Sequence, residues 1–319
     1  MYCVLDEIVF GPVPSRRLGR SLGINNLPRK ICSYSCIYCQ AGRTIELSIS
    51  RKEFYCPYYL EKIVRNRVKR LKEIGERIDY ITFVPNGEPT LDKNLGFEAR
   101  LLKDHGIPIA VLTNGSLLWM EDIRNDLLEF DYVSIKIDSV SDNIWRYINR
   151  PHHDLRLEKI LDGILEFRSI YHGKLVTETM LIGNIDYGDE LAFIAEYLGE
   201  LKPDIAYISI PTRPPAEKWI KPPREDLLNK AYQLFSERID RVELLIGFEG
   251  TNFTTLDLDH ISREILSIAC VHPLRKDVLE DMLKRSGATW DIVNELIERG
   301  ELIEVYYGEY RYYLRRVMR

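Results

Sequence analysis

The stretch YITFV, residues 80–84, is a short apolar run that ends at the turn residues PNG. A strand that is apolar on both faces is typical of a parallel sheet covered by helices. Similar runs recur between residues 20 and 250, separated by longer amphipathic stretches. Strands that alternate with helices predict an α/β fold, and right-handed connections can wind its parallel sheet into a full or partial barrel. The predicted strands are Ser21–Asn25, Asp79–Val84, Ile107–Leu112, Tyr132–Ile137, Leu175–Leu181, Ile205–Ile210 and Val242–Phe248. The predicted helices lie near Tyr58–Ile74, Leu95–Asp104, Met120–Leu128, Leu155–Tyr171, Asp189–Leu201 and Arg224–Arg238.

The composition is that of a globular chain. Of its 319 residues 45% are hydrophobic, which supports one large domain with a small one attached. No uncharged apolar run reaches the roughly 18 residues of a transmembrane helix. The N-terminal stretch MYCVLDEIVF has no basic region, so we expect no signal peptide and a cytoplasmic location. The net charge of −5 argues against nonspecific nucleic-acid binding by the whole surface.

The pattern changes after residue 250. Residues 251–258 are predicted to link a domain at 1–250 to a second domain at 259–319. Three helices followed by a hairpin predict a winged helix-turn-helix, with Pro273 opening the second helix. The predicted elements are the helices Asp259–Val271, Leu274–Arg285 and Thr289–Arg299 and the strands Leu302–Tyr307 and Tyr310–Leu314. Acids on the third helix, at 291, 295 and 298, favour protein docking or packing over DNA binding by that helix.

Three of the six cysteines lie within eight residues, in the segment CSYSCIYC. They are Cys32, Cys36 and Cys39, with the spacing C-x3-C-x2-C. Such a cluster indicates metal or redox chemistry, and thiolates suit iron–sulfur clusters and zinc. Three cysteines on one loop can hold three corners of a cubane and leave the fourth iron open. The alternatives are a zinc site without its fourth ligand and buried structural thiols; the nearest histidine, His105, is too distant for local closure.

The segment KICSYSCIYCQAGRT, residues 30–44, resembles the signature loop of the radical S-adenosylmethionine (SAM) enzymes, including the aromatic Tyr38 before the last cysteine. The resemblance implies a partial, TIM-like (β/α)6 barrel with the loop after its first strand. It implies a 4Fe–4S cluster on Cys32, Cys36 and Cys39, with SAM bound at the open iron. An electron from the cluster would break a carbon–sulfur bond of SAM, and the resulting 5′-deoxyadenosyl radical would take a hydrogen atom from a second substrate.

The stretch NGEPT, residues 86–90, follows the second strand and resembles the Gly-Gly-Glu loop of this family, with Asn86 in place of the first glycine. The resemblance implies that Gly87 and Glu88 hold the methionine ammonium group. Asn114 ends the third strand at the C-terminal rim, where barrel enzymes place their sites. The alternative for both motifs is a simple turn.

Ser134, Lys136 and Asp138 alternate along the fourth strand and therefore share one side of the sheet. They resemble the Lys/Asp pair that contacts the ribose hydroxyls in glycyl-radical activating enzymes. The alternative is a structural ion pair, since a buried lysine and aspartate need polar partners. One face of the fifth strand is expected to line the adenosine pocket, and whether this is the face that carries Glu178 stays undecided.

Basic residues are concentrated before and after the cysteines. The segment Gly11–Glu73 has 14 lysines and arginines against 4 acids. Arg16 and Arg17 lie in a Gly/Pro-rich loop, and Arg213 lies in the proline-rich stretch after the sixth strand. These three arginines are candidates to bind an anionic second substrate. The alternative for the helical part, residues 65–72, is a solvated helix face.

The stretch from Phe10 to Thr44 looks like a subgroup grouped with the wyosine-forming tRNA synthetases. That resemblance implies modification of RNA, with tRNA foremost. Cys3 and Cys56 do not supply the second cysteine set of wyosine enzymes, so modification of a protein or peptide is a second hypothesis and a redox-sensing regulator a third. The chemistry implies an external electron donor of the flavodoxin or ferredoxin type and no membrane partner.

Overall fold

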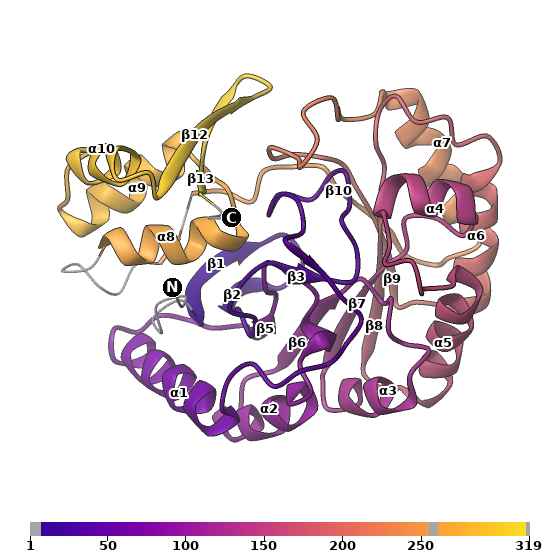
Figure 1. The fold of residues 1–319 in the computed structure, drawn as a ribbon, viewed down its shortest axis with the longest axis horizontal. Coiled ribbons are helices and arrows are strands. Elements are labelled where there is room, and N and C mark those ends of the chain that lie inside the picture. The colour runs from indigo at the N-terminus through magenta and orange to yellow at the C-terminus, as the bar shows by residue number, and fades with distance from the viewer. Residues whose placement is uncertain (1–7, 252, 255–260, 317–319) are drawn as a thin grey trace.

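One eight-stranded sheet forms the centre of the computed structural model, which describes residues 8–251, 253–254 and 261–316 (Figure 1). Its strand order is β1-β2-β5-β6-β7-β8-β9-β10, with β1 antiparallel to β2 and the other neighbours parallel. The strands are β1 Val9–Ser15, β2 Gly19–Ile24, β5 Tyr80–Phe83, β6 Ile109–Thr113, β7 Tyr132–Lys136, β8 Lys174–Met180, β9 Ile205–Ser209 and β10 Val242–Leu245. The sheet curls into a half-barrel whose edges are β1 and β10, so the predicted α/β partial barrel is confirmed.

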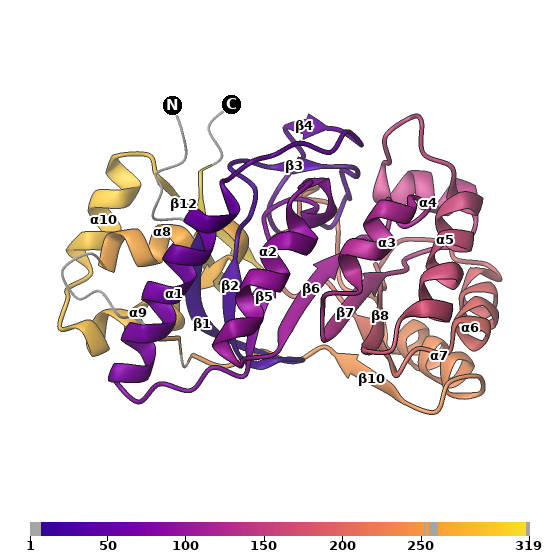
Figure 2. The same ribbon diagram turned by 90° about the horizontal axis from the view of Figure 1, so that it is seen from below.

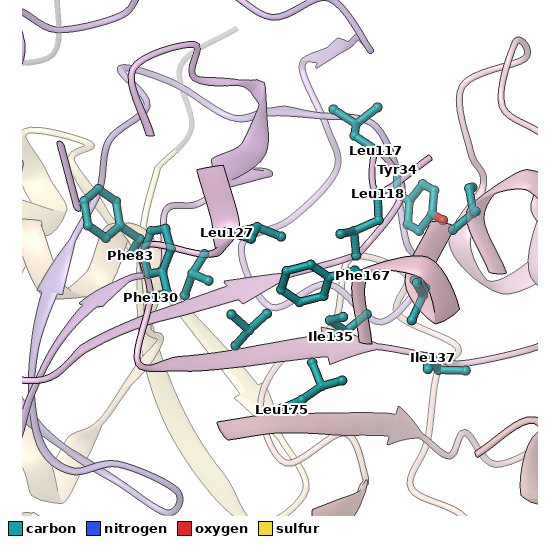
Figure 3. Close-up of a cluster of buried hydrophobic side chains, with 14 of the residues drawn as sticks. Tyr34, Phe83, Leu117, Leu118, Leu127, Phe130, Ile135, Ile137, Phe167 and Leu175 are labelled. Carbon is teal, nitrogen blue, oxygen red and sulfur yellow. The ribbon is translucent and has the colours of Figure 1, made fainter. Parts of the chain in front are cut away.

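Helices cover the outer face of this sheet (Figures 1 and 2). They are α1 Pro57–Glu73, α2 Leu95–Leu102, α3 Glu121–Leu127, α4 Asp142–Asn149, α5 Leu157–Ile170, α6 Glu190–Leu201 and α7 Glu225–Ser236. Between helices and strands lies the main core, where Ile135 and Leu175 of the sheet approach Leu127 of α3 and Phe167 of α5 (Figure 3). Each such side chain contributes about 1.5–3 kcal/mol on burial. This core fixes the strand ends on which the site is built.

Strand β1 and helix α4 of the half-barrel were not predicted. Strand β1 contains Pro12 and Pro14, which cannot donate to a ladder, and such residues are tolerated at a sheet edge. Helix α4 is short, and only Trp145, Ile148 and Asn149 of its eight residues are buried. The last strand is shorter than predicted, because β10 ends at Leu245.

The C-terminal residues form three helices and a small sheet in the order α8 Ile261–Val271, β11 Leu274–Arg275, α9 Lys276–Ser286, α10 Asp291–Glu298, β12 Leu302–Tyr307 and β13 Tyr310–Arg315. The sheet order is β11-β13-β12, and both strand pairs are antiparallel. A helix beginning at Leu274 was a wrong prediction, because Leu274 and Arg275 pair with Tyr313 and Tyr312 of β13. The predicted helix start at residue 259 lies outside the described residues.

The C-terminal unit packs on the edge of the large sheet. Phe10 and Val13 of β1 share a hydrophobic cluster with side chains of α8 and α9. Within the predicted linker Phe253 is fully buried in the same cluster; of the remaining residues 251–258, most lie outside the described ones. Arg67 of α1 donates to the Gly11 carbonyl at 2.6 Å and to a Glu264 carboxylate oxygen of α8 at 3.0 Å. Covering a sheet edge in this way protects it from pairing with other chains.

None of the described helices combines the length and the apolar character needed to cross a membrane.

Candidate iron–sulfur and cofactor site

The cysteine loop follows β2 and is anchored by α4. Cys32 lies in a short strand, β3 Ile31–Cys32, which pairs with β4 Glu46–Leu47. Tyr34 points into the main core, where Trp145 donates its indole N–H to the Tyr34 hydroxyl at 3.0 Å (Figure 3). The backbone N–H of Ile37 donates to the carbonyl of Ile148 at 2.9 Å. Contacts with α4 therefore fix the middle of the loop, between Cys32 and Cys39.

Each cysteine sulfur has its own nitrogen donor from a different part of the chain. Lys30 Nζ lies 3.0 Å from Cys39 Sγ, Asn149 Nδ2 lies 3.4 Å from Cys36 Sγ, and Asn114 Nδ2 lies 3.6 Å from Cys32 Sγ. Hydrogen bonds to sulfur are a feature of iron–sulfur sites, where they tune the reduction potential.

The spread of the three sulfurs separates a cluster from a single ion. Zinc–sulfur bonds of about 2.3 Å place tetrahedral zinc ligands less than about 4 Å apart. Among the described residues, the only three-residue group of potential ligands whose atoms lie within 4.8 Å of one another is the consecutive, largely exposed set His152, His153 and Asp154. The three cysteine sulfurs do not form such a compact group, so at least two of them lie more than 4.8 Å apart, which is wider than the ligands of one zinc ion.

The electrostatics of the thiols also fit a metal group. Burial raises the pKa of Cys32 to about 12 and raises that of Cys36 as well. Burial also acts to raise the pKa of Cys39, but the adjacent Lys30 ammonium outweighs it and lowers that pKa. Thiols ligate iron as thiolates, so a bound cluster would displace their protons.

Gly87 and Glu88 are packed directly against the cysteine loop. The backbone N–H of Glu88 donates to the Ile31 carbonyl at 3.0 Å. The Glu88 side chain is 1% exposed and accepts hydrogen bonds from the Thr113 hydroxyl at 2.6 Å and the Asn114 backbone N–H at 2.8 Å. Burial raises the pKa of Glu88 and these bonds offset part of that effect. Glu88 thus ties three loops together, and its predicted contact with the methionine ammonium stays a prediction.

Gly87→Ala is expected to damage this junction. A Cβ at Gly87 would lie 1.8 Å from the Ile31 carbonyl oxygen, so the two loops would have to separate. We expect a loss of about 1–3 kcal/mol in the free energy of unfolding and reduced iron content after reconstitution. Denaturant unfolding and iron assays check this against Gly247→Ala, because a Cβ at Gly247 would meet nothing within 4 Å. Equal stability of the two variants would contradict the packing argument.

Ser134, Lys136 and Glu178 meet Arg17 in one buried polar network. Arg17 donates to the Glu178 carboxylate and lies 3.4 Å from Ser134 Oγ. Lys136 Nζ lies 3.1 Å from a Glu178 oxygen, and Ser209 Oγ donates to the same oxygen at 2.8 Å. Burial acts to raise the pKa of Glu178, but Arg17 and Lys136 outweigh it and hold that pKa well below its usual range. The face of β8 that carries Glu178 therefore points toward this network.

Asp138 connects the network to the cysteine loop. Asn149 Nδ2 donates to Asp138 at 2.8 Å, and the Tyr38 hydroxyl donates to the same carboxylate oxygen. Lys136 Nζ lies 4.8 Å from the centre of the Tyr38 ring. Asn114, Lys136, Asp138 and Asn149 line one small cavity of about 20 Å³. The structure thus brings the predicted cofactor residues of three strand ends to one place beside the cysteines.

Arg16 and Arg213 meet around a single acid, Glu249. Arg213 donates to Glu249 and to Gln40 Oε1 at 2.7 Å, while Arg16 Nε lies 4.0 Å from Glu249. Burial, followed by the charge of Arg16, lowers the pKa of Arg213 to about 9. Gln40 follows Cys39 directly, so this group borders the cysteine loop.

Much of the basic excess of residues 11–73 is balanced by ion pairs, and the exposed lysines and arginines of α1 remain as a solvated helix face. Most of the lysines and arginines of this segment pair with acids, either within the segment or in other parts of the chain. The pairs include Arg17–Glu178, Arg20–Glu76, Arg29–Glu46, Arg43–Glu217, Arg51–Asp126, Lys52–Glu46, Arg65–Glu61 and Arg67–Glu264. Charge counted along the sequence therefore overstated the attraction for a polyanion.

Comparison with known proteins agrees with this geometry. The family model described as the radical SAM superfamily matches residues 27–198, more than half of the chain. The UPF0026 protein MJ1312 of Methanocaldococcus jannaschii is 49% identical over 313 residues, covering 97% of this chain and 96% of that protein.

Two solved structures share the fold. TYW1 with a lysine–pyruvate adduct bound is 16% identical with a TM-score of 0.52, covering 69% of this chain and 74% of that one. Streptococcus suis SuiB bound to precursor peptide SuiA is 14% identical with a TM-score of 0.52, covering 74% of this chain and 49% of that one. Radical SAM enzymes use a 4Fe–4S cluster and SAM, and the three-cysteine loop fits that cluster. This chain is a member of the radical SAM superfamily.

Proposed function

We propose that this protein cleaves SAM reductively and uses the resulting radical on a second substrate. The observation that carries the proposal is the loop of three half-buried cysteines, each with a nitrogen donor at its sulfur. A 4Fe–4S cluster bound there supplies one electron to the carbon–sulfur bond of SAM. The chain's own residues position SAM and exclude water, as is usual for cofactor enzymes.

The polar residues beside the cysteines suit SAM. Lys136 and Asp138, 3.8 Å apart, are proposed to hold the ribose hydroxyls. The half-buried Asn114 and the buried Glu88 are proposed to order the loops around the methionine. Addition of SAM to the reduced, reconstituted protein should change the electron paramagnetic resonance (EPR) spectrum of the cluster. Asp138→Asn should weaken that response, while Asp186→Asn, on an exposed loop, should not. An unchanged spectrum at saturating SAM would contradict direct binding at the cluster.

Lys30→Met is expected to lower the cluster's reduction potential. The Lys30 side chain is buried, donates to Cys39 Sγ at 3.0 Å and donates to the Asn86 carbonyl at 3.1 Å. Its charge and hydrogen bond favour the reduced, more negative cluster. A charged hydrogen bond of about 1.5–3 kcal/mol corresponds to a shift of about 60–130 mV for one electron. A redox titration followed by EPR checks this, with the half-exposed Lys52→Met as control; equal potentials would contradict the role.

The second substrate is proposed to be RNA, with tRNA foremost. The resemblance of residues 10–44 to the wyosine-forming group and the tyrosine-rich hairpin β12–β13 support this. The paired arginines of residues 11–73 do not, so the proposal rests on local stacking rather than on overall charge. Mass spectrometry of tRNA nucleosides from a deletion strain should reveal a missing modification, restored by the wild-type gene and not by Cys36→Ala. An unchanged nucleoside profile would contradict it.

A protein or peptide substrate is the alternative. The element order α8-β11-α9-α10-β12-β13 supports a winged-helix unit at residues 259–319, behind a half-barrel at 1–250 and a connection at 251–258. Its helix α10 carries Asp291 and Glu295, which disfavour phosphate, and SuiB shows that this fold can accept a peptide. Reaction in the cytoplasm with a flavodoxin or ferredoxin donor suits either substrate. Modified peptides in the proteome of the wild type, absent from the deletion strain, would favour this alternative.

A further inference from the structure

A cavity of about 330 Å³ lies between the half-barrel and the C-terminal unit. One wall consists of the residues after β9 and β10, and the other comes from the α8–β11 turn and the tip of the β12–β13 hairpin. Ligands of parallel sheets bind at the carboxyl ends of the strands, which is where this cavity opens. Its volume falls in the range of about 300–1,000 Å³ typical of small-molecule sites.

The inner end of the cavity carries an uncompensated positive charge. The Glu249 carboxylate is 4% exposed and is shared by Arg213, Arg16 and His272, whose Nε2 lies 2.9 Å away. Burial and then the neighbouring arginines lower the pKa of His272 well below its usual value, so this imidazole is neutral at pH 7. Arg213 lines the cavity, and Arg16 lies outside the lining on the other side of Glu249. Two arginines thus share one carboxylate, and the excess positive charge beside the cavity complements a single phosphodiester. The other acid of the lining, Glu309, is exposed at the hairpin tip.

The outer part of the cavity is a layered aromatic wall. The Arg275 guanidinium lies between two rings, 3.8 Å from the centre of Phe248 and 4.0 Å from that of Tyr310. Phe248 and Tyr310 remain 43% and 49% exposed, which leaves ring surface available to a ligand. Nucleobases stack on aromatic rings and on arginine planes.

The cavity is next to the cysteine loop. Arg213 donates to Gln40 Oε1, and Gln40 Nε2 donates to the Val271 carbonyl at 3.0 Å. Gln40 therefore joins Cys39 to the sheet-side arginine and to the end of α8. A ligand held by Arg213 would lie beside the loop on which SAM is proposed to be cleaved.

We propose that this cavity binds a nucleotide of the second substrate, with the base against Phe248 and Tyr310 and the phosphate toward Arg213, while Arg16 adds positive charge from outside the lining. This inference rests on the proposed function and adds where the second substrate binds and to which chemical class it belongs. The nucleotide is either a free mononucleotide or one residue of an RNA, because both present the same base and phosphate.

Isothermal titration calorimetry of the reconstituted protein tests the proposal. The probes are the four ribonucleoside 5′-monophosphates, their unphosphorylated nucleosides and mixed-sequence ribotrinucleotides. We expect at least one nucleotide to bind, more tightly than its nucleoside. Tighter binding of a mononucleotide than of any trinucleotide would identify a free nucleotide as the source, and the reverse order would identify RNA.

Single substitutions distinguish the contribution of the aromatic end of the cavity from that of the arginine end. Tyr310→Ala should weaken nucleotide binding about ten-fold, because stacking contributes roughly 1–3 kcal/mol per base. Tyr306→Ala, on the outer side of the same hairpin and outside the cavity lining, should bind as the wild type does. Arg213→Gln should weaken the nucleotide and leave nucleoside binding unchanged.

Two results would overturn the proposal: no binding of any nucleotide, or equal binding by Tyr310→Ala, Arg213→Gln and the wild type. Binding of an acidic peptide without any nucleotide binding would overturn it in favour of a peptide site. SAM cleavage, assayed on the same preparation, distinguishes the two failures. Cleavage without nucleotide binding contradicts the cavity inference alone, and absence of cleavage contradicts the proposed function.

Discussion

Replacing Cys36 by alanine is expected to abolish assembly of the iron–sulfur cluster. Cys36 is the middle cysteine of the loop, and its sulfur is buried among Asn149, Asp138 and Tyr38. A cubane held by three cysteines loses one of its corners in this variant, and the chain offers no replacement in the loop. Iron and sulfide assays after anaerobic reconstitution, together with the EPR spectrum of the reduced protein, should show loss of more than nine-tenths of the cluster, which corresponds to a weakening of at least about 1.4 kcal/mol.

Cys56→Ala provides the matched control. Cys56 is exposed where α1 begins, and its side chain accepts no capping hydrogen bond from the helix. The Cys56→Ala variant should therefore assemble the cluster as the wild type does. A Cys36→Ala protein that retains a full 4Fe–4S content would contradict the assignment of the three ligands.

Replacing Glu178 by alanine is expected to cause the largest loss of stability among single substitutions in the site. Glu178 is the shared partner of Arg17 and Lys136, and its removal leaves two buried cations without that acid. Removing one partner of a buried ion pair costs about 3–5 kcal/mol. Urea unfolding at pH 7 measures this difference. Glu243→Ala, which breaks a half-exposed pair with Arg241 on β10, should cost about 1 kcal/mol or less.

The pH dependence gives a second check on Glu178. Because its folded-state pKa is held below the unfolded value of about 4.3, the ionised group stabilises the fold above that pH. The advantage declines as the pH falls toward the folded-state pKa. The difference in unfolding free energy between wild type and Glu178→Ala should therefore shrink below about pH 4. A difference that is independent of pH would contradict the ion network.

The strands were predictable because buried parallel strands are visible in the sequence as short apolar runs. All seven predicted strands correspond to strands of the large sheet, with ends shifted by a few residues. Strand β1 was not predicted because its two prolines indicate a turn, and only the sheet order, which places β1 at an edge, explains how a strand accommodates them. The strand position of Leu274 was not predicted, because a proline before an amphipathic run suggests the start of a helix. Pairing with Tyr313 instead holds Leu274 in a strand.

The cysteine ligands were predictable from spacing, but their surroundings were not. Lys30 precedes the motif by two residues and could have been noticed as a basic residue beside the cysteines. Asn149 could not, because it reaches Cys36 through α4, more than one hundred residues along the chain. The partners of Arg17 and Arg213 are likewise set by tertiary contacts. A count of basic residues along the sequence therefore suggested a surface that binds polyanions, whereas ion pairs in the fold neutralise much of that charge.

The most direct test of the central claim is the fate of SAM itself. The reconstituted protein, reduced anaerobically with dithionite and mixed with SAM, should form 5′-deoxyadenosine and methionine, measured by liquid chromatography and mass spectrometry. Cys36→Ala should form neither, and Cys56→Ala should form both. No 5′-deoxyadenosine from protein that carries a full, reducible 4Fe–4S cluster would contradict the account.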